Sequence, residues 1–463
     1  MKEINPSNGF CSKTKIYHSL RPQVILPPTN QPLSASEYAI SLLRSSSLSL
    51  ENTIAFIDSS TGTSLSYSDF IKQTESLSFS LHNRFGLKRG DTAFILSSTS
   101  LQIPILYFSL LSLGVIVSPA NPISTIPEIS RQISLVKPVI GFSTSVTSNK
   151  LPSFHHGTVL LDSLDFKSML TIQQPGRVNV QVVQTDTAAI LYSSGTTGLV
   201  KGVELTHRNF IAFTAGHNQV RLEMVEENQP HPIGLFTIPL FHVFGFCVAL
   251  IAVALGETAV LMDRFDFEGM LKAVETYKVT YVPVSPPLVV AMAKLDLVDK
   301  FDLSSLLVVA CGGAPLGYVG DDEATVATLD SEGWLKTGDL CNVDNDGFLY
   351  IVDRLKELIK YKAYQVPPAE LEHLLQTHLE IADVAVVPYP DEEAGQIPMA
   401  FVVRKPGSNL TGIQVMEFVA KQVAPYKKIR RVAFVSSIPK SAAGKISRKE
   451  LIDSIQTTPL SKL

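Results

Sequence analysis

A run of glycines, hydroxylated residues and one lysine is the part of this sequence best suited to chemistry. The run, Tyr192–Val203, reads YSSGTTGLVKGV and follows an apolar stretch, Ala188–Leu191, that is typical of a strand. Glycines let backbone N–H groups approach phosphate oxygens, hydroxyls add donors, and Lys201 adds a positive charge. The pattern therefore predicts a cradle for a polyphosphate. Thr206 is expected to cap a helix that follows the run.

The run differs from the P-loop, GxxxxGK[ST], of many nucleotide-hydrolysing proteins. Lys201 is followed by Gly202, where that motif places the hydroxyl that meets Mg²⁺. A second lysine, Lys445, lies in a separate loop far along the chain. These features disfavour a P-loop kinase or ATPase. A featureless flexible loop is the other alternative, and the order of twelve consecutive positions argues against it.

Alternating short strands and helices surround this run and must position it. Apolar periodicity predicts helices at 35–43, 103–113 and 127–135 and strands at 94–96, 115–117 and 139–142. Such alternation continues to about Val308 and favours an α/β fold built on a mainly parallel sheet.

A change of composition near Asp353 predicts a second domain. The charged segment DRLKELIKYK begins there, and a compact α+β pattern follows, with helices at 369–377 and 412–422 and strands at 384–388, 400–403 and 431–435. We therefore expect an N-terminal arm at 1–34, a large domain at 35–355 and a small domain at 356–463.

Composition excludes several classes of protein. The 463 residues include 39 Lys and Arg against 43 Asp and Glu, a net charge of −4 that argues against a nucleic-acid binder or a basic membrane surface. Hydrophobic residues make up 45%, so wholesale disorder is excluded. The four cysteines form no CxxC and are expected to be thiols rather than disulfides or zinc ligands. The apolar runs Ile103–Val117 and Phe246–Met262 are interrupted and favour buried segments over membrane spans.

The two ends of the sequence bear on localisation. The first residues show no apolar core of a secretory signal. The last three, Ser461-Lys462-Leu463, match a peroxisomal address that an import receptor reads. We expect a peroxisomal protein, and otherwise a cytoplasmic one. A solvated terminus without meaning is the alternative.

Six segments in the same order resemble the adenylate-forming (AMP-binding) acyl-CoA synthetase family. Besides 192–203, they are PLFHVFG at 239–245, GGAPLG at 312–317, WLKTGD at 334–339, DRLKELIK at 353–360 and PKSAAGK at 439–445. The resemblance extends from about residue 17 to the end and is strongest to plant 4-coumarate–CoA ligase-like proteins of the peroxisomal branch. It implies a large N-terminal domain and a small C-terminal domain that rotates between two half-reactions.

The resemblance implies an acid–thiol ligase that uses ATP, CoA and Mg²⁺. A carboxylate attacks the α-phosphorus of ATP to give acyl-AMP and pyrophosphate, and the CoA thiol then displaces AMP. The implied catalytic residues are Lys445, Lys360 and His242. The implied ATP-binding residues, which also include Lys445, are Ser193, Ser194, Gly195, Thr196, Thr197, Lys201, Asp339 and Arg354.

Further residues would hold the acyl-adenylate and CoA. For the acyl-adenylate the resemblance implies Phe244, Gly313, Ala314, Pro315, Lys356, Lys360 and Gln365. For CoA it implies Arg264, Lys362 and Ala363. A packed core role is the alternative for His242, and solvated charges are the alternative for Arg264 and Lys362.

Phe244 bears on the choice of acid. It stands where 4-coumarate ligases have tyrosine, so an apolar wall replaces a polar contact with a phenol. Among fatty, jasmonate-precursor and phenylpropanoid acids, this favours the first two.

A segment of the family pattern is missing. Gly317 is followed directly by Tyr318, and the GYGxTE motif does not occur in the sequence. In the family, the glutamate of that motif ligates Mg²⁺, and a β-rich stretch with a GELxxxG-type motif follows it. No metal ligand can therefore be assigned. The gap predicts exposed sheet edges and favours a catalytically impaired splice or gene-model variant that retains partial nucleotide binding, with little or no ATP–pyrophosphate exchange.

Overall fold

The computed structural model describes most of the chain as two compact units. The described residues are 4–172, 176, 178–193, 201–224, 230–284, 288, 292, 295–310, 339–343, 349–354, 357–362, 364–440 and 446–457. One unit is Val24–Lys336, and the other combines Met1–Gln23 with Thr337–Leu463. The predicted boundaries at 34/35 and 355/356 remain predictions.

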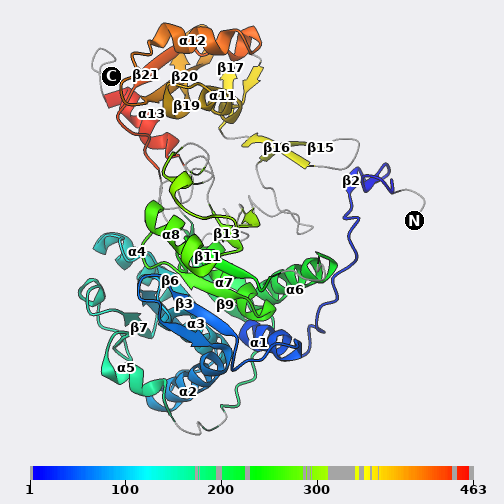
Figure 1. The fold of residues 1–463 in the computed structure, drawn as a ribbon, viewed down its shortest axis with the longest axis vertical. Coiled ribbons are helices and arrows are strands. Elements are labelled where there is room, and N and C mark those ends of the chain that lie inside the picture. Colours follow the sequence, from blue (N-terminus) through cyan, green and yellow to red (C-terminus); the bar gives the residue numbers. More distant parts are fainter. Residues whose placement is uncertain are drawn as a thin grey trace. The chain divides into compact units, whose positions relative to one another are not determined.

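In its described residues, the larger unit contains two six-stranded sheets (Figure 1). The first has the order β10-β9-β6-β5-β7-β8, and all its neighbours are parallel except β9 and β10. Its strands are β5 (Thr92–Leu96), β6 (Ile116–Ala120), β7 (Ile140–Ser143), β8 (Thr158–Leu160), β9 (Thr187–Ser193) and β10 (Lys201–Thr206).

The second sheet has the order β14-β13-β11-β12-β3-β4, and only β3 and β4 are antiparallel. Its strands are β3 (Ile54–Asp58), β4 (Ser64–Ser66), β11 (Ile233–Phe236), β12 (Thr258–Leu261), β13 (Tyr281–Pro283) and β14 (Val308–Ala310). The edge strand β14 leaves apolar side chains in water, since Val308 is 53% exposed and Val309 is 42% exposed.

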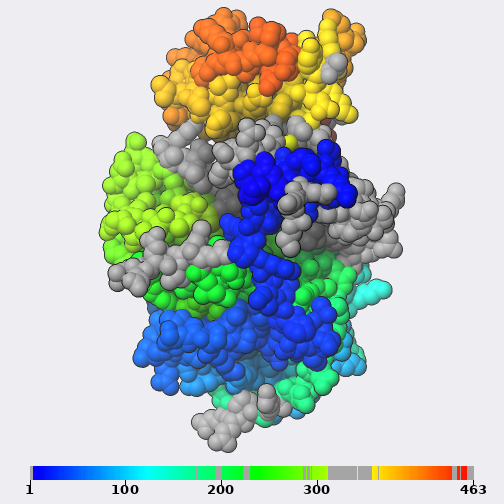
Figure 2. All heavy atoms as spheres, turned by 90° about the vertical axis from the view of Figure 1, so that its right-hand side faces the viewer, coloured from blue at the N-terminus to red at the C-terminus, as the bar shows by residue number. Residues whose placement is uncertain are grey.

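Helices form a layer shared by both sheets. The helices of the larger unit are α1 (Ala35–Ser45), α2 (Tyr67–Phe85), α3 (Gln102–Ser112), α4 (Ile126–Val136), α5 (Leu164–Met169), α6 (His207–Met224), α7 (Val243–Leu255) and α8 (Phe267–Tyr277), with short 3₁₀ turns η1 (Ser148–Lys150) and η2 (Val298–Lys300). Side chains of α1, α2, α3 and α7 join strands of both sheets in one hydrophobic core. The segments of this unit that follow Val24, in shades of blue, form part of the face that Figure 2 shows.

Strand alternation explains how both faces of the first sheet are covered. In β5, Ala93 and Ile95 face the shared helical layer, whereas Phe94 and Leu96 pack with α4 on the other face. Helices α3 and α7 are apolar all round because they are enclosed, which explains why their sequences look like membrane segments. Across the helices that the structure describes, none has the length and apolar character needed to cross a bilayer.

The smaller unit contains a five-stranded sheet covered by helices. Strands β18, β17, β20 and β19 follow in that order, and β21 pairs with β20. Its elements are β17 (Ile359–Tyr361), β18 (Tyr364–Val366), α11 (Pro368–Gln376), β19 (Ile381–Asp391), β20 (Gly395–Arg404), α12 (Gly412–Ala420), η3 (Pro425–Lys427), β21 (Arg431–Phe434) and α13 (Arg448–Thr457). Two further strand pairs are β1 (Phe10–Cys11) with β2 (Ile16–Tyr17) and β15 (Asp339–Val343) with β16 (Leu349–Arg354).

Most elements expected from periodicity are confirmed. The predicted α/β class with a mainly parallel sheet is present, and the runs Ile103–Val117 and Phe246–Met262 are a buried helix followed by a strand. The N-terminal arm contains the short strand pair β1–β2, in which the centroids of the Phe10 and Tyr17 rings lie 5.0 Å apart. Among the described residues, Cys11, Cys247 and Cys341 form no disulfide with one another, and Cys311 lies outside the described residues.

Candidate functional site

The predicted phosphate cradle lies at the open end of an antiparallel strand pair. Strand β9 ends at Ser193 and β10 begins at Lys201, and these two residues are paired across the strands. The glycine-rich residues 194–200 therefore connect two strand ends that are held together by the backbone hydrogen bonds of an antiparallel pair. Ser194, Gly195, Thr196 and Thr197 themselves lie outside the described residues. Sequence reasoning expected the strand before the loop but missed that Lys201 begins another one.

Helix α6 follows this strand pair, and its start is capped as predicted. Thr206 Oγ1 accepts a hydrogen bond from Asn209 N at 3.2 Å, and Asn209 Oδ1 accepts one from Thr206 N at 2.8 Å. His207, the first residue of α6, is fully buried, and its Nδ1 accepts from Ala35 N at 3.0 Å. The helix after the cradle is thereby fixed to the start of α1.

His242 directly precedes helix α7 and Phe244 lies in its first turn, and side chains of α7 belong to the main core of the larger unit. His242 Nδ1 accepts a hydrogen bond from Phe244 N at 3.3 Å and so caps the helix. Both side chains are half-buried, and Phe244 packs against the main core. A helix-capping role thus accounts for part of the geometry of His242, and the half-buried Phe244 provides an apolar surface next to it. Their proposed contact with an acid remains a prediction.

The two residues expected at the ribose are direct cross-strand partners. Asp339 begins β15 and Arg354 ends β16, and their Cα atoms are paired in the antiparallel register. The sequence predicted that both flank one sugar but gave no sign of this pairing. The strand register thus places these two residues side by side along the backbone.

The residues expected in the thioester step also form a strand pair. Lys360 in β17 and Gln365 in β18 are cross-strand partners, and both are exposed. Lys362 lies in the connecting turn with φ of 50° and forms an ion pair of 2.7 Å with Glu393. Its hydrogen bond to that carboxylate raises the pKa of the Lys362 ammonium. The predicted CoA contact of Lys362 would therefore have to compete with Glu393.

The stem of the segment that carries Lys445 is held by several contacts. Lys440 pairs with Ile446 in an antiparallel bridge, and Ser447 N donates to Pro439 O at 2.8 Å. Lys440 Nζ also lies 2.6 Å from Asp383 Oδ2 in β19. The segment 441–445 thus starts and ends at one point of the smaller unit.

Several predicted site residues cannot be placed. Lys445, Gly313, Ala314, Pro315, Lys356 and Ala363 lie outside the described residues. Arg264 is described, and it is exposed just beyond the end of β12.

A magnesium ion would need several oxygen donors gathered at one place. Within the described ranges, no three His, Cys, Asp or Glu side chains gather in a way that could hold a metal ion.

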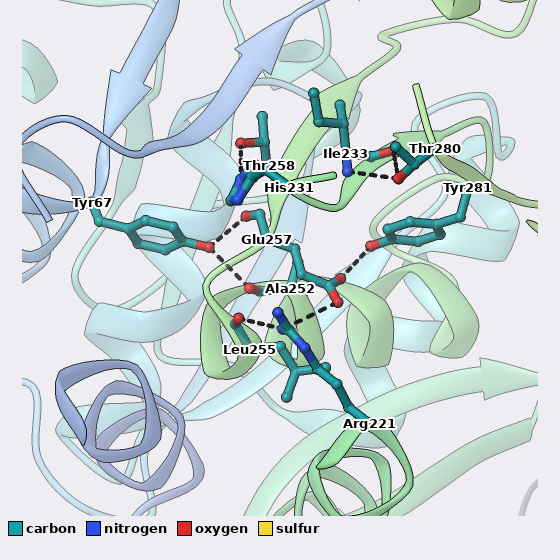
Figure 3. Close-up of polar contacts among 10 residues, drawn as sticks. All are labelled: Tyr67, Arg221, His231, Ile233, Ala252, Leu255, Glu257, Thr258, Thr280 and Tyr281. Atoms are coloured by element: carbon teal, nitrogen blue, oxygen red, sulfur yellow. Dashed lines mark hydrogen bonds and ion pairs between the residues drawn. The ribbon is translucent and has the colours of Figure 1, made fainter. Parts of the chain in front are cut away.

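A buried polar cluster that the sequence did not indicate lies at the amino ends of β11, β12 and β13 (Figure 3). Glu257, only 8% exposed, accepts a hydrogen bond from Tyr281 Oη at 2.7 Å and lies 3.5 Å from Arg221 Nη1. Tyr67 Oη donates to the carbonyl oxygens of Glu257 and Ala252 at 2.6 and 2.9 Å. The cluster joins α2, α6, α7 and β13 at the amino ends of the strands. Ligands of α/β proteins commonly bind at the opposite end of the sheet, where the strands have their carboxyl ends.

The cluster predicts a pH-dependent contribution to stability. Burial raises the pKa of Glu257, so the folded chain retains a proton that the unfolded chain loses above its ordinary pKa of 4.5. Stability from this group is full below pH 4.5 and is lost as pH rises through the folded pKa, by at most about 1.4 kcal/mol per pH unit. Glu257→Gln should remove this dependence, so the variant gains stability relative to the native chain as pH rises above 4.5. Guanidinium unfolding of both proteins at several pH values measures this gain. A difference in unfolding free energy that stays constant with pH would contradict the prediction.

The comparisons with known proteins agree with the motifs. The family model described as AMP-binding enzyme matches residues 45–323, and the model described as AMP-binding enzyme C-terminal domain matches residues 370–445. Among solved structures, ATP-bound MatB from Rhodopseudomonas palustris superposes with a TM-score of 0.79 at 18% identity, covering 92% of this chain and 99% of that one. That likeness supports the fold.

Two curated relatives from Arabidopsis thaliana match nearly the whole chain. The protein 4-coumarate–CoA ligase-like 9 is 48% identical over 97% of this chain and 96% of its own length. Peroxisomal OPC-8:0-CoA ligase 1 is 38% identical over 98% of each. The first alignment spans 543 positions although this chain has 463 residues, so at least 80 of them (543 − 463) face no residue here.

Proposed function

Because this chain belongs to the AMP-binding enzyme family, among the 4-coumarate–CoA ligase-like proteins, we propose that its site is of the ATP-dependent acid–CoA ligase type. In the first step a carboxylate oxygen bonds to the α-phosphorus of ATP, and pyrophosphate leaves. In the second step the CoA sulfur bonds to the acyl carbonyl carbon, and AMP leaves. The thiol proton passes to solvent or to AMP.

One observation carries this proposal: the strand pair that holds Ser193 opposite Lys201 at the ends of the glycine-rich residues. Two strands joined by a ladder fix the base of a loop rich in N–H and hydroxyl donors, and Lys201 adds charge beside it. We assign the β- and γ-phosphates to this place. The cross-strand pair Asp339 and Arg354 receives the ribose hydroxyls.

Two lysines of the smaller unit, Lys445 and Lys360, serve different steps of the proposed reaction. Lys445 meets the carboxylate and the α-phosphate, where an ammonium offsets the repulsion of two anions. Lys360 and its partner Gln365 serve the thioester step, and Lys356 is the hinge between the two arrangements. Arg264, Lys362 and Ala363 flank CoA. Gly313, Ala314 and Pro315 line the acyl-adenylate.

The acid is proposed to be a fatty acid or a jasmonate precursor. Phe244 presents an apolar ring beside His242 at the start of α7, which suits an alkyl chain better than a phenol. One relative is named for a CoA ligase of OPC-8:0 in peroxisomes. We extend that localisation to this chain through Ser461-Lys462-Leu463 and an import receptor.

A second candidate is a catalytically impaired variant that retains partial nucleotide binding. At least 80 positions of the first relative face no residue here, and we place that gap between Gly317 and Tyr318. Leu307, Val308 and Val309 leave apolar side chains exposed at the edge strand β14, close before this junction. Loss of a metal-binding carboxylate and of sheet cover would weaken adenylation but leave the strand pair β9–β10 in place.

ATP–pyrophosphate exchange separates the two candidates. Purified protein is supplied with Mg²⁺ and with fatty, jasmonate-precursor or hydroxycinnamic acids, and ATP binding is measured in parallel by calorimetry. We expect ATP binding with little or no exchange, because the gap removes groups that act on the α-phosphate. Robust exchange that disappears in Lys445→Ala would reject the impaired variant. Absence of ATP binding by a folded protein would reject both candidates.

A further inference from the structure

Arg448 connects segments of the smaller unit that lie far apart in the sequence. It is the first residue of α13, and its guanidinium binds two carboxylates. Nη2 lies 2.8 and 2.7 Å from the two oxygens of Glu372 in α11, and Nη1 lies 2.7 Å from Glu357 Oε2. The Arg448 and Glu372 side chains are only 17% and 9% exposed, so this contact is shielded from water.

The inner part of this network fixes α13 to the central sheet. Val386 N in β19 donates to Glu372 Oε1 at 2.8 Å, and Arg448 Nε donates to Val386 O at 3.3 Å. The Arg448 guanidinium, the Glu372 carboxylate and the Val386 backbone are therefore linked in a closed cycle of hydrogen bonds. Removing Arg448 would leave a buried carboxylate without its cation, which destabilises a fold strongly.

The outer part reaches the segment that leads to Lys360. Glu357 is 34% exposed and directly precedes buried Leu358 and strand β17. On its other side, Arg448 directly follows Ser447, whose N–H is bonded to Pro439 at the stem of the 441–445 segment. One side chain thus joins the stem of the Lys445 segment to the start of the Lys360 strand.

We propose that Arg448 is a positioning residue that sets the spacing between these two segments, with Glu357 as its separable contact. The inference rests on the proposed function, in which Lys445 serves adenylation and Lys360 serves thioester formation. Both lysines belong to the smaller unit. A fixed spacing between the two segments would allow this unit to bring either lysine to the reacting groups without a change in its own fold. Arginine is required because its planar fork binds two carboxylates at once, which the ammonium of lysine cannot reproduce.

The first test needs no enzymatic activity. Hydrogen–deuterium exchange of the full chain is followed in peptides covering 355–366 and 436–449. Glu357→Gln leaves the Arg448–Glu372 contact in place and should fold; we expect exchange in both peptides to accelerate by roughly threefold or more. The matched control is Glu370→Gln, which breaks the 2.7 Å Glu370–Lys427 pair on the same helix as Glu372 and should change neither peptide. Acceleration confined to 355–366, or none, would overturn the proposal.

The second test separates positioning from stability. The segment-restored chain is this chain with the corresponding residues of 4-coumarate–CoA ligase-like 9 inserted between Gly317 and Tyr318. In it, Glu357→Gln should lower the kcat of both half-reactions roughly tenfold while the KM for ATP changes less than twofold, and Glu357→Asp should recover part of the loss. Unchanged kcat would overturn the proposal. If the unsubstituted segment-restored chain is inactive, the proposed function fails, and the exchange experiment still decides the role of Arg448.

Discussion

The segment-restored chain is expected to catalyse ATP–pyrophosphate exchange at least about 100-fold faster than the native chain, because adenylation depends on placing and neutralising several charges at once. The described residues supply the strand pair behind the phosphate cradle and the stem of the Lys445 segment. By resemblance to the family, the absent residues supply a carboxylate for Mg²⁺ and a wall of the adenine and acyl pockets. Losing a charge-bearing group and a pocket wall together should therefore reduce the rate steeply.

The measurement compares both chains with the same acids at equal concentrations of folded protein. Lys445→Ala in the segment-restored chain should abolish the recovered exchange, whereas Lys421→Ala, at an exposed lysine that ends α12, should leave it unchanged. Equal and substantial exchange by both chains would show that the absent residues are dispensable. Exchange that survives Lys445→Ala would remove that lysine from the proposed mechanism.

Local sequence patterns predicted the elements that depend on nearby residues. The helix predicted at 127–135 forms as α4 (Ile126–Val136), since Pro127 suits its first turn and Thr125 with Glu128 completes a capping box. The apolar stretch Ala188–Leu191 also predicted strand β9 before the glycine-rich residues, and Thr206 was predicted as the helix cap. These features require no knowledge of what packs against them.

Contacts between distant segments could not be predicted in this way. The buried cluster of Glu257 combines Tyr67, Arg221 and Tyr281 from separate elements, and no local spacing marks them as partners. The Arg448 network is similar, because its carboxylates lie 76 and 91 residues earlier in the chain (448 − 372 and 448 − 357). In the N-terminal arm, the strands β1 and β2 are only two residues each, which is too short for a period to be recognised.

His207 should make the larger unit acid-sensitive. Its Nδ1 accepts a hydrogen bond from Ala35 N, so in the neutral ring the proton lies on Nε2, which has no partner within the described part of the chain. Protonation would place an N–H group opposite the Ala35 N–H and a charge in the core. Burial accordingly lowers the pKa of His207 to about 4, and Asp186 offsets this only in part.

The direction of this pH effect follows from when His207 binds a proton in the folded and in the unfolded chain. The unfolded chain binds a proton at His207 below its ordinary pKa of 6.5, whereas the folded chain does not until pH falls to about 4. Stability is therefore full above pH 6.5 and decreases by about 3 kcal/mol as pH falls to 4. The variant His207→Asn retains an oxygen that can accept from Ala35 N but cannot titrate. It should be less stable than the native chain at pH 7 by about 1 kcal/mol, through lost packing, and more stable at pH 4.

Guanidinium unfolding between pH 4 and 7 measures this crossing of stabilities, with exchange of the Ala35 amide as a local readout. The exposed His155→Asn is the matched control and should follow the native chain at every pH. Parallel curves for the native chain and His207→Asn would show that the buried ring finds a proton acceptor on acidification. We expect the two stability curves to cross because a proton on His207 Nδ1 would replace the acceptor to which the Ala35 N–H donates.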